Sequence, residues 1–224
     1  MIENILFKLS IMLVPGLLAI TCHEVAHGYV AWRYGDPTAR MLGRLTLNPL
    51  KHIDIFGTLM LVIVGIGWAK PVPVVIENLR NPKKDMIWVS IAGPVTNICL
   101  ALVSAVLLRL ILAVPSSGTE ANFMLQPLSY MAAFSVYINL LLAFFNMIPI
   151  PPLDGGRVLM GLLPYRQALA LGRIEPYGMI LIIVLVFFTP VFSYLLLPLL
   201  VAGIKILTGP YSLLVFKVAS FKVM

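Results

Sequence analysis

The stretch TCHEVAHG, residues 21–28, places a His-Glu-x-x-His motif directly after the apolar run Ile11–Ile20. On a helix, positions i and i+4 share a face, so His23 and His27 can direct two imidazoles at one metal ion. Glu24 lies beside that face, where a general base would take a proton from water at the metal. Ionisable groups in membrane-grade apolar sequence are costly and usually functional, which disfavours two histidines that contact only solvent. The motif therefore predicts a metal centre at membrane depth.

The composition is that of an integral membrane protein. Of the 224 residues, 60% are hydrophobic and 11% are charged, whereas a soluble domain is about a quarter charged. No polar stretch is long enough to fold by itself, so we expect one integral-membrane domain over residues 1–224. The net charge of +7 is distributed by loop, so no nucleic-acid partner is expected. The N-terminus lacks a positively charged leader, and the first apolar segment should be retained.

Four apolar segments are long enough for roughly 20 residues of membrane-spanning helix each. They cover approximately residues 5–34, 86–108, 121–153 and 176–204. Pro190 and Pro198 interrupt the last segment, so it is expected to be either one kinked span or two helices. The sequence thus predicts a mainly α fold, a polytopic transmembrane helical bundle with four to six membrane segments in a lipid bilayer.

A fifth apolar stretch, Ile55–Ala69, is too short and too rich in glycine to be a confident span. Its centre is β-branched, and Pro71 and Pro73 follow it. We expect a small re-entrant β-hairpin over Ile55–Val75, shielded from lipid by the helices.

Positive charges alternate between the predicted loops. The segment between the first two spans carries eight of them: Arg33, Arg40, Arg44, Lys51, Lys70, Arg80, Lys83 and Lys84. The next connection carries only Glu120, and the following one carries Arg157, Arg166 and Arg173. Because positive loops stay inside, we expect a multi-pass protein of the cell membrane with its N-terminus outside. The zinc motif and the Arg157–Arg173 loop then face the cytoplasmic side.

Asp154 is the predicted third metal ligand. A zinc hydrolase needs three protein ligands and one open position. The predicted topology brings Asp154 to the depth of His23 and His27, in the rigid, non-helical stretch NMIPIPPLDGG, residues 146–156. Asp154 can also cap the helix that begins at Gly155. His52, in a polar turn, is the rival ligand, and Cys22 is interpreted as a small apolar helix residue rather than a ligand.

Several stretches together resemble the site-2 protease family of intramembrane zinc metalloproteases, peptidase family M50. They are HEVAHG (23–28), GWAKPVPV (67–74), AGPVTN (92–97) and the stretch at 146–156, and the resemblance spans roughly residues 13–157. The chain looks like the short bacterial or archaeal form, which has no PDZ domain. The resemblance implies one Zn²⁺ ion per chain and a substrate that is a single-span membrane protein, such as an anti-sigma factor.

Three asparagines in the apolar segments need hydrogen-bond partners. Asn146 is nearest Asp154, and with the support of the family resemblance it is a candidate oxyanion donor or a packing residue. Asn139 is interpreted as a packing residue. For Asn97, two roles remain open: holding the substrate or the active-site carboxylate, or hydrogen-bonding between helices.

The sequence therefore predicts an intramembrane zinc endopeptidase that acts in regulated intramembrane proteolysis. Zinc lies on His23, His27 and Asp154, while Glu24 is the general base and Asn146 a possible catalytic donor. The alternative is a non-enzymatic membrane metal-binding protein or transporter. A transporter needs ligands along a route through the membrane, but these ligands cluster at one end. The sequence does not indicate an oligomeric state.

Overall fold

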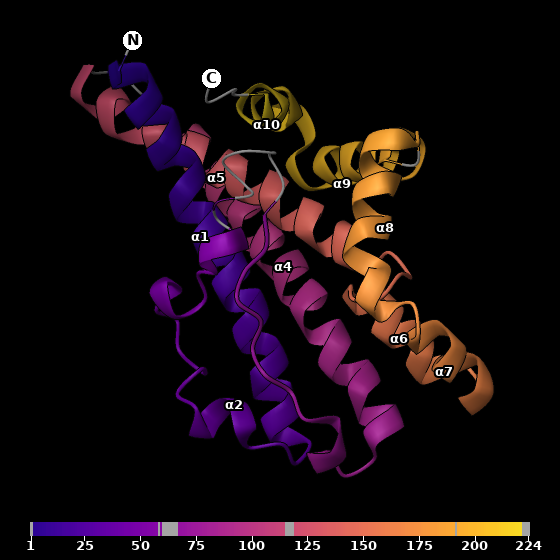
Figure 1. The fold of residues 1–224 in the computed structure, drawn as a ribbon. Coiled ribbons are helices and arrows are strands. Elements are labelled where there is room, and N and C mark those ends of the chain that lie inside the picture. Colours follow the sequence, from indigo (N-terminus) through magenta and orange to yellow (C-terminus); the bar gives the residue numbers. More distant parts are fainter. Residues whose placement is uncertain (1, 58, 60–66, 115–118, 191, 221–224) are drawn as a thin grey trace. The chain divides into compact units, whose positions relative to one another are not determined.

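The computed structural model describes residues 2–57, 59, 67–114, 119–190 and 192–220, and the described part is mainly helical (Figure 1). Its long helices are α1 (Ile2–Arg33), α4 (Pro82–Ala113) and α5 (Thr119–Asn146). The segment between α1 and α4 holds α2 (Thr38–Met41) and the 3₁₀ turns η1 (Pro49–Lys51) and η2 (Ile76–Asn78). After α5 come α6 (Asp154–Leu162), α7 (Tyr165–Gly172) and α8 (Glu175–Phe188). The chain continues through the π-helical turn η3 (Phe192–Leu196), α9 (Leu197–Thr208), η4 (Gly209–Tyr211) and α10 (Ser212–Ala219).

Among the described residues, four helical segments are long and apolar enough to cross a membrane: Leu6–Arg33, Pro82–Ala113, Phe123–Asn146 and Ser193–Ala219. Helices α7 and α8 together form a further candidate, bent by 66°. The predicted number of membrane segments is confirmed on this basis. The predicted segment 176–204 is not one helix, because α8 ends at Phe188 and the next candidate begins at Ser193. Pro190, which cannot continue the hydrogen-bond ladder of a helix, lies at this break.

The predicted β-hairpin over Ile55–Val75 is not supported. The described residues contain no named strand, only an isolated antiparallel bridge between Ile53 and Ala69. Residues 58 and 60–66, the centre of the predicted hairpin, lie outside the described part. Downstream, Pro71 and Pro73 have no amide hydrogen to donate to a partner strand. The amide of Val72 donates instead to the Glu24 carboxylate, at 2.7 Å.

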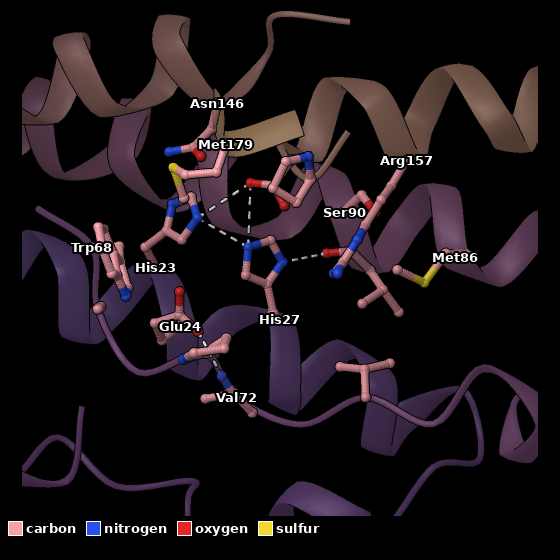
Figure 2. A pocket seen from close by; sticks show the side chains of 16 residues that line it. His23, Glu24, His27, Trp68, Val72, Met86, Ser90, Asn146, Arg157 and Met179 are labelled. Carbon is pink, nitrogen blue, oxygen red and sulfur yellow. Dashed lines mark hydrogen bonds and ion pairs between the residues drawn. The ribbon is translucent and has the colours of Figure 1, made fainter. Parts of the chain in front are cut away.

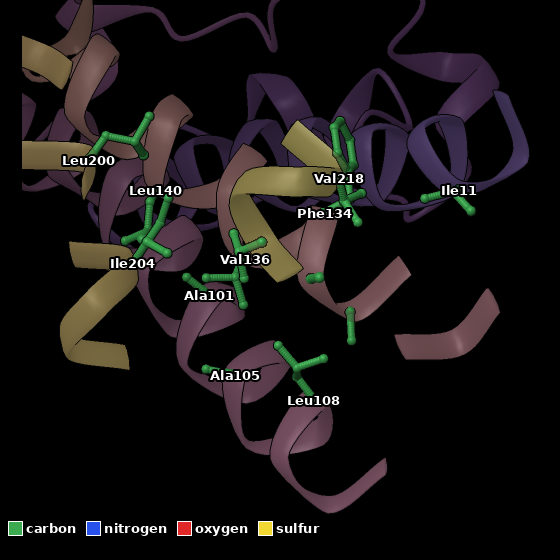
Figure 3. Packing of buried hydrophobic residues seen from close by; sticks show 13 residues of the cluster. Ile11, Ala101, Ala105, Leu108, Phe134, Val136, Leu140, Leu200, Ile204 and Val218 are labelled. Atoms are coloured by element: carbon green, nitrogen blue, oxygen red, sulfur yellow. The ribbon is translucent and has the colours of Figure 1, made fainter. Parts of the chain in front are cut away.

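The chain divides into two compact units, and the first contains residues 1–19, 97–145 and 189–224. Its core is formed by small and branched apolar side chains, including Ile11, Ala101, Leu108, Val136 and Ile204 (Figure 3). Small residues such as Ala101 and Ala105 let membrane helices approach closely.

Asn97 and Asn139 are buried in this first unit. The Asn97 amide donates to the backbone oxygen of Ala19 at 3.2 Å and to the side-chain oxygen of Asn139 at 2.8 Å. Asn139 in turn donates to the backbone oxygen of Ser135 at 2.9 Å. These contacts join α1, α4 and α5 through polar groups that would be costly if left unpaired. They favour the packing role for both asparagines.

The second unit contains residues 20–96 and 146–188, and it holds every residue of the metal centre. Within it, the non-helical segment Gly67–Val75 runs beside the end of α1 (Figure 1). Arg44 donates to the backbone oxygen of Lys70 at 2.9 Å, and the fully buried Asp36 accepts the amide of Val75 at 2.7 Å. These contacts fix the segment against the loop that follows α1.

Asp36 is an ionised anchor at the base of this segment. Burial alone raises the pKa of a carboxyl group, but hydrogen bonds from Asn78, Thr38 and the Val75 amide outweigh burial and lower the pKa of Asp36. The carboxylate therefore stays charged and holds both ends of the loop that follows α1.

Candidate metal centre

Three potential metal ligands converge in the second unit (Figure 2). The Nε2 atoms of His23 and His27 lie 3.0 Å apart. Oδ2 of Asp154 lies 3.2 Å from Nε2 of His23 and 3.4 Å from Nε2 of His27. His23 and Asp154 are each only 7% exposed. The structure thus brings together the three residues that the sequence predicts as ligands.

Helical geometry positions the two histidines. Both lie on α1, four residues apart, so their rings leave the same face of the helix. Nδ1 of His27 lies 2.7 Å from the backbone oxygen of Val89 on α4. A carbonyl can only accept, so Nδ1 carries a proton, and in the neutral ring Nε2 then presents its lone pair to the cavity. Such a contact orients a histidine ligand and increases its basicity.

The proline-rich segment after α5 positions Asp154. Helix α5 ends at Asn146, and α6 begins at Asp154 itself. A side chain on Gly155 would collide with the backbone of Met147, and one on Gly156 would collide with the backbone at Ile150 and Pro151. Both glycines are therefore needed, because the backbone after Asp154 packs closely against residues 147–151, and this packing positions the Asp154 carboxylate.

Gly93 on α4 faces the two histidine rings directly. A Cβ at this position would lie 2.5 Å from Cε1 of His23 and 2.5 Å from Nε2 of His27. The rings therefore occupy space that any other residue would fill. This contact explains why glycine stands beside Pro94 in the middle of an apolar helix.

The donor set fits a zinc ion. Oδ2 of Asp154 is buried and has no hydrogen-bond partner among the described residues, although two imidazoles lie within 3.4 Å. A buried carboxylate oxygen without a partner is expensive unless a cation satisfies it. Two imidazole nitrogens and one carboxylate oxygen are a usual ligand set of catalytic zinc.

The charge state of Asp154 agrees with this role. Burial raises the pKa of the carboxyl group, but the adjacent imidazoles of His23 and His27 outweigh burial and hold the pKa of Asp154 well below its usual range. A lowered pKa favours the carboxylate form, which is the form that binds a metal ion.

Glu24 and Asn146 line the same cavity as the ligands but are not part of the ligand cluster. One oxygen of Glu24 accepts the Val72 amide at 2.7 Å, which sets the orientation of the carboxylate. Asn146 is the last residue of α5 and enters the cavity from the side of Met179 (Figure 2).

His52 and Cys22 do not join the metal cluster of the described residues. His52 is buried elsewhere in the loop, with Nε2 at 2.9 Å from the backbone oxygen of Thr46. The rival prediction for the third ligand therefore finds no support, and His52 supports the loop instead.

The cavity has a volume of about 240 Å³ and includes residues that the sequence analysis did not assign to the site. They include Trp68, Ser90, Arg157 and Met179. Arg157 follows Asp154 by three positions on α6, so helical periodicity alone places it on the same face. No sequence signal points to Met179, which reaches the cavity from a helix that begins 21 residues after Asp154.

Comparisons with known proteins find a peptidase family and relatives named as zinc metalloproteases. The model of "Peptidase family M50" matches residues 11–189. "Putative zinc metalloprotease YwhC" of Bacillus subtilis is 41% identical over 207 residues, covering 88% of this chain and 90% of that protein. "Putative zinc metalloprotease Rip2" of Mycolicibacterium smegmatis is 31% identical over 185 residues, covering 78% and 66% respectively. No solved structure matches significantly.

The matched region contains the His-Glu-x-x-His motif, the glycine beside the rings and Asp154. Its apolar helices and this family place the protein in a lipid bilayer as a multi-pass membrane protein. The chain therefore belongs to peptidase family M50, the site-2 protease family, and is a zinc metalloprotease.

Proposed function

We propose that this metalloprotease cleaves peptide bonds within or next to transmembrane segments of other membrane proteins. The observation that carries the proposal is the position of the two histidines, on a helix long and apolar enough to cross a membrane. An active site on such a helix is accessible to a substrate that lies in the same bilayer. Residues 1–224 would then form one integral-membrane protease domain.

Each site residue has a defined role in this proposal. His23, His27 and Asp154 would hold the zinc ion, which supplies Lewis acidity to the scissile carbonyl group and to the attacking water. Glu24 takes the proton of that water on its carboxylate and later gives it to the leaving amine. The Val72 amide donates to one oxygen of Glu24 and keeps the side chain oriented. This hydrogen bond has to persist both when Glu24 is a carboxylate and when it holds the proton taken from the water.

Asn146 is the proposed donor to the carbonyl oxygen of the scissile bond. Its amide lines the cavity beside the ligands, where a neutral donor can stabilise developing negative charge. Loss of such a donor typically costs about 10²-fold or more in kcat. Replacing Asn146 with alanine should therefore lower kcat while the zinc content stays unchanged.

The substrate must be extended at the bond that is cleaved, because a helical backbone hides its carbonyl carbon. The non-helical segment Gly67–Val75 borders the cavity through Trp68, Val72 and Val74. A substrate strand can lie along this segment and use backbone hydrogen bonds that do not depend on sequence. Such binding suits single-span regulators, including anti-sigma factors, that are released by regulated intramembrane proteolysis.

The charge pattern supports a cytoplasmic position of the active site. The basic loop after α1 and the basic region from Arg157 to Arg173, which carries Arg166, would both lie inside the cell, and the Glu120 connection would lie outside. Single cysteines at Arg44, Glu120 and Arg166, in a background without Cys22 and Cys99, test this arrangement with an impermeant thiol reagent. Outside labelling at Arg166 together with inside labelling at Arg44 would contradict it.

Co-expression with a panel of single-span membrane proteins tests the function directly. The wild-type protease should shorten some of them, with new ends mapping in or near the transmembrane segment. Glu24→Gln is the matched control, because the substitution removes the base but keeps the shape of the side chain. Equal cleavage by both proteins, or cleavage confined to soluble loops, would refute the proposal.

A further inference from the structure

Ser90 is the first of two polar residues in the described lining of the cavity that the proposed mechanism does not use. It lies on α4, three residues before Gly93, and is 1% exposed. A helical serine commonly returns its hydroxyl to a carbonyl of the preceding turn. The Ser90 hydroxyl instead has no hydrogen-bond partner among the described residues, and the side chain lines the cavity. A buried hydroxyl without a partner needs an explanation, and a polar group bound in the cavity would supply one.

Arg157 is the second polar residue of the cavity that the proposed mechanism does not use. It lies on α6, three residues after Asp154, and its side chain lines the same cavity. Its guanidinium lies 3.6 Å from the Glu175 carboxylate, with the two side chains 38% and 40% exposed. An ion pair so long and so accessible to water is weak, and it uses only one edge of the guanidinium. Most of the N–H donors of Arg157 therefore remain available.

The charges of the cavity distinguish Arg157 from the residues of the metal centre. The other ionisable residues that line it are the ligands His23, His27 and Asp154, and Glu24. Arg157 is therefore the one side chain with a fixed positive charge in the described lining of the cavity. In the view of Figure 2, Ser90 and Arg157 both lie on the side of His27 that is away from Trp68 and Glu24.

We propose that Ser90 and Arg157 form a subsite that binds a carboxylate of the substrate close to the scissile bond. A guanidinium donates two parallel hydrogen bonds to a carboxylate, and the serine hydroxyl can donate a third. The proposal rests on the proposed protease function and adds a preference to it. Substrates with an acidic side chain, or with their C-terminal carboxylate, near the cleaved bond should be favoured over neutral ones.

The test uses a matched pair of zinc-chelating probes. Alkyl hydroxamates that end in a carboxylate are compared with the same compounds ending in a carboxamide, over a series of increasing chain length. Affinity for the purified zinc-loaded protein in detergent is measured by calorimetry. At the best chain length, the carboxylate probe should bind at least about tenfold more tightly than its carboxamide, because charge-assisted hydrogen bonds are the stronger ones.

Two variants and a control assign this preference to the subsite. Arg157→Gln should reduce the carboxylate preference to near unity, and Ser90→Ala should reduce it in part, while affinity for the carboxamide probe changes little. Arg166→Gln is the control for the loss of one positive charge, because Arg166 is exposed on α7 and does not line the cavity. This variant should keep the full preference.

The outcomes separate this proposal from the proposed function. If neither probe of the pair binds, the metal centre itself is wrong. If both bind equally to the wild-type protein, the subsite does not exist although the metal centre stands. The subsite is also refuted if Arg166→Gln removes the preference as fully as Arg157→Gln does. A matched pair of cleavable substrates, with Glu or Gln beside the bond, then distinguishes a side-chain carboxylate from a C-terminal one.

Discussion

Replacing Gly93 with alanine perturbs the metal centre without changing any ligand. The new Cβ would lie 2.5 Å from ring atoms of both histidines, whereas ordinary van der Waals contact begins at 3.4 Å. The rings or the helix must therefore move by about 0.9 Å, while ligand distances in genuine metal sites vary by only about 0.2 Å. A displacement of that size takes at least one imidazole out of bonding range.

The expected result is a loss of zinc affinity of about 10- to 100-fold, the range for changes just outside the ligands. Zinc content is measured by mass spectrometry after dialysis against a competing chelator, and helicity by circular dichroism. Helicity should be retained, because alanine is favoured over glycine in a helix by about 1 kcal/mol.

Gly16→Ala is the matched control. Gly16 is also a glycine within a long apolar helix, but an added Cβ there meets nothing within 4 Å. This variant should bind zinc like the wild-type protein. Unchanged zinc affinity in Gly93→Ala, or an equal loss in Gly16→Ala, would refute the argument that the absence of a side chain at position 93 makes room for the metal centre.

Three further predictions follow from the same geometry. Glu24→Gln should keep about one zinc per chain while peptide cleavage falls by at least about 10²-fold; loss of zinc in this variant would make Glu24 a ligand rather than the base. Asp154→Ala should lose most of the bound zinc, whereas His52→Ala should retain it, and the reverse pattern of zinc content would make His52 the third ligand. Asp36→Asn should lower the free energy of unfolding in detergent at neutral pH by about 1–3 kcal/mol, because a buried charged acceptor is lost. Since the pKa of Asp36 is lowered in the folded state, its contribution is present above its ordinary value of 3.8 and is lost as the pH falls through the lower folded value. The wild-type protein should therefore lose stability in that acidic range by more than Asp36→Asn does, as thermal unfolding at a series of pH values can show.

The cluster of His23, His27 and Asp154 was predictable because much of its information is local. The spacing of His23 and His27 fixes their shared face on any helix, and the prolines and glycines around Asp154 indicate a break that presents a carboxylate. The charge pattern restricted the choice of a third ligand further. Gly93 also carried a signal, since a glycine in an apolar helix indicates the close approach of a neighbour.

Other contacts could not be predicted because they join distant parts of the chain. Glu24 and Val72 are 48 residues apart, and no local pattern indicates that a loop amide holds the carboxylate. The same contact helps to explain why the described part of the predicted β-hairpin contains no strand. Apolar, β-branched residues favour a strand, but they do not reveal that the Glu24 carboxylate takes the amide between Pro71 and Pro73.

The metal centre also depends on a second close approach, in which α8 packs directly on the proline segment that leads to Asp154. A side chain on Gly178 would collide with the backbone oxygen of Pro151 and with the ring of Pro152. Residues of increasing size at this position would push the segment, and with it the carboxylate, away by increasing amounts. Such a series would give variants with identical ligands but stepwise weaker zinc binding. Comparing their turnover would measure, within one protein, how catalysis depends on the spacing of the ligands.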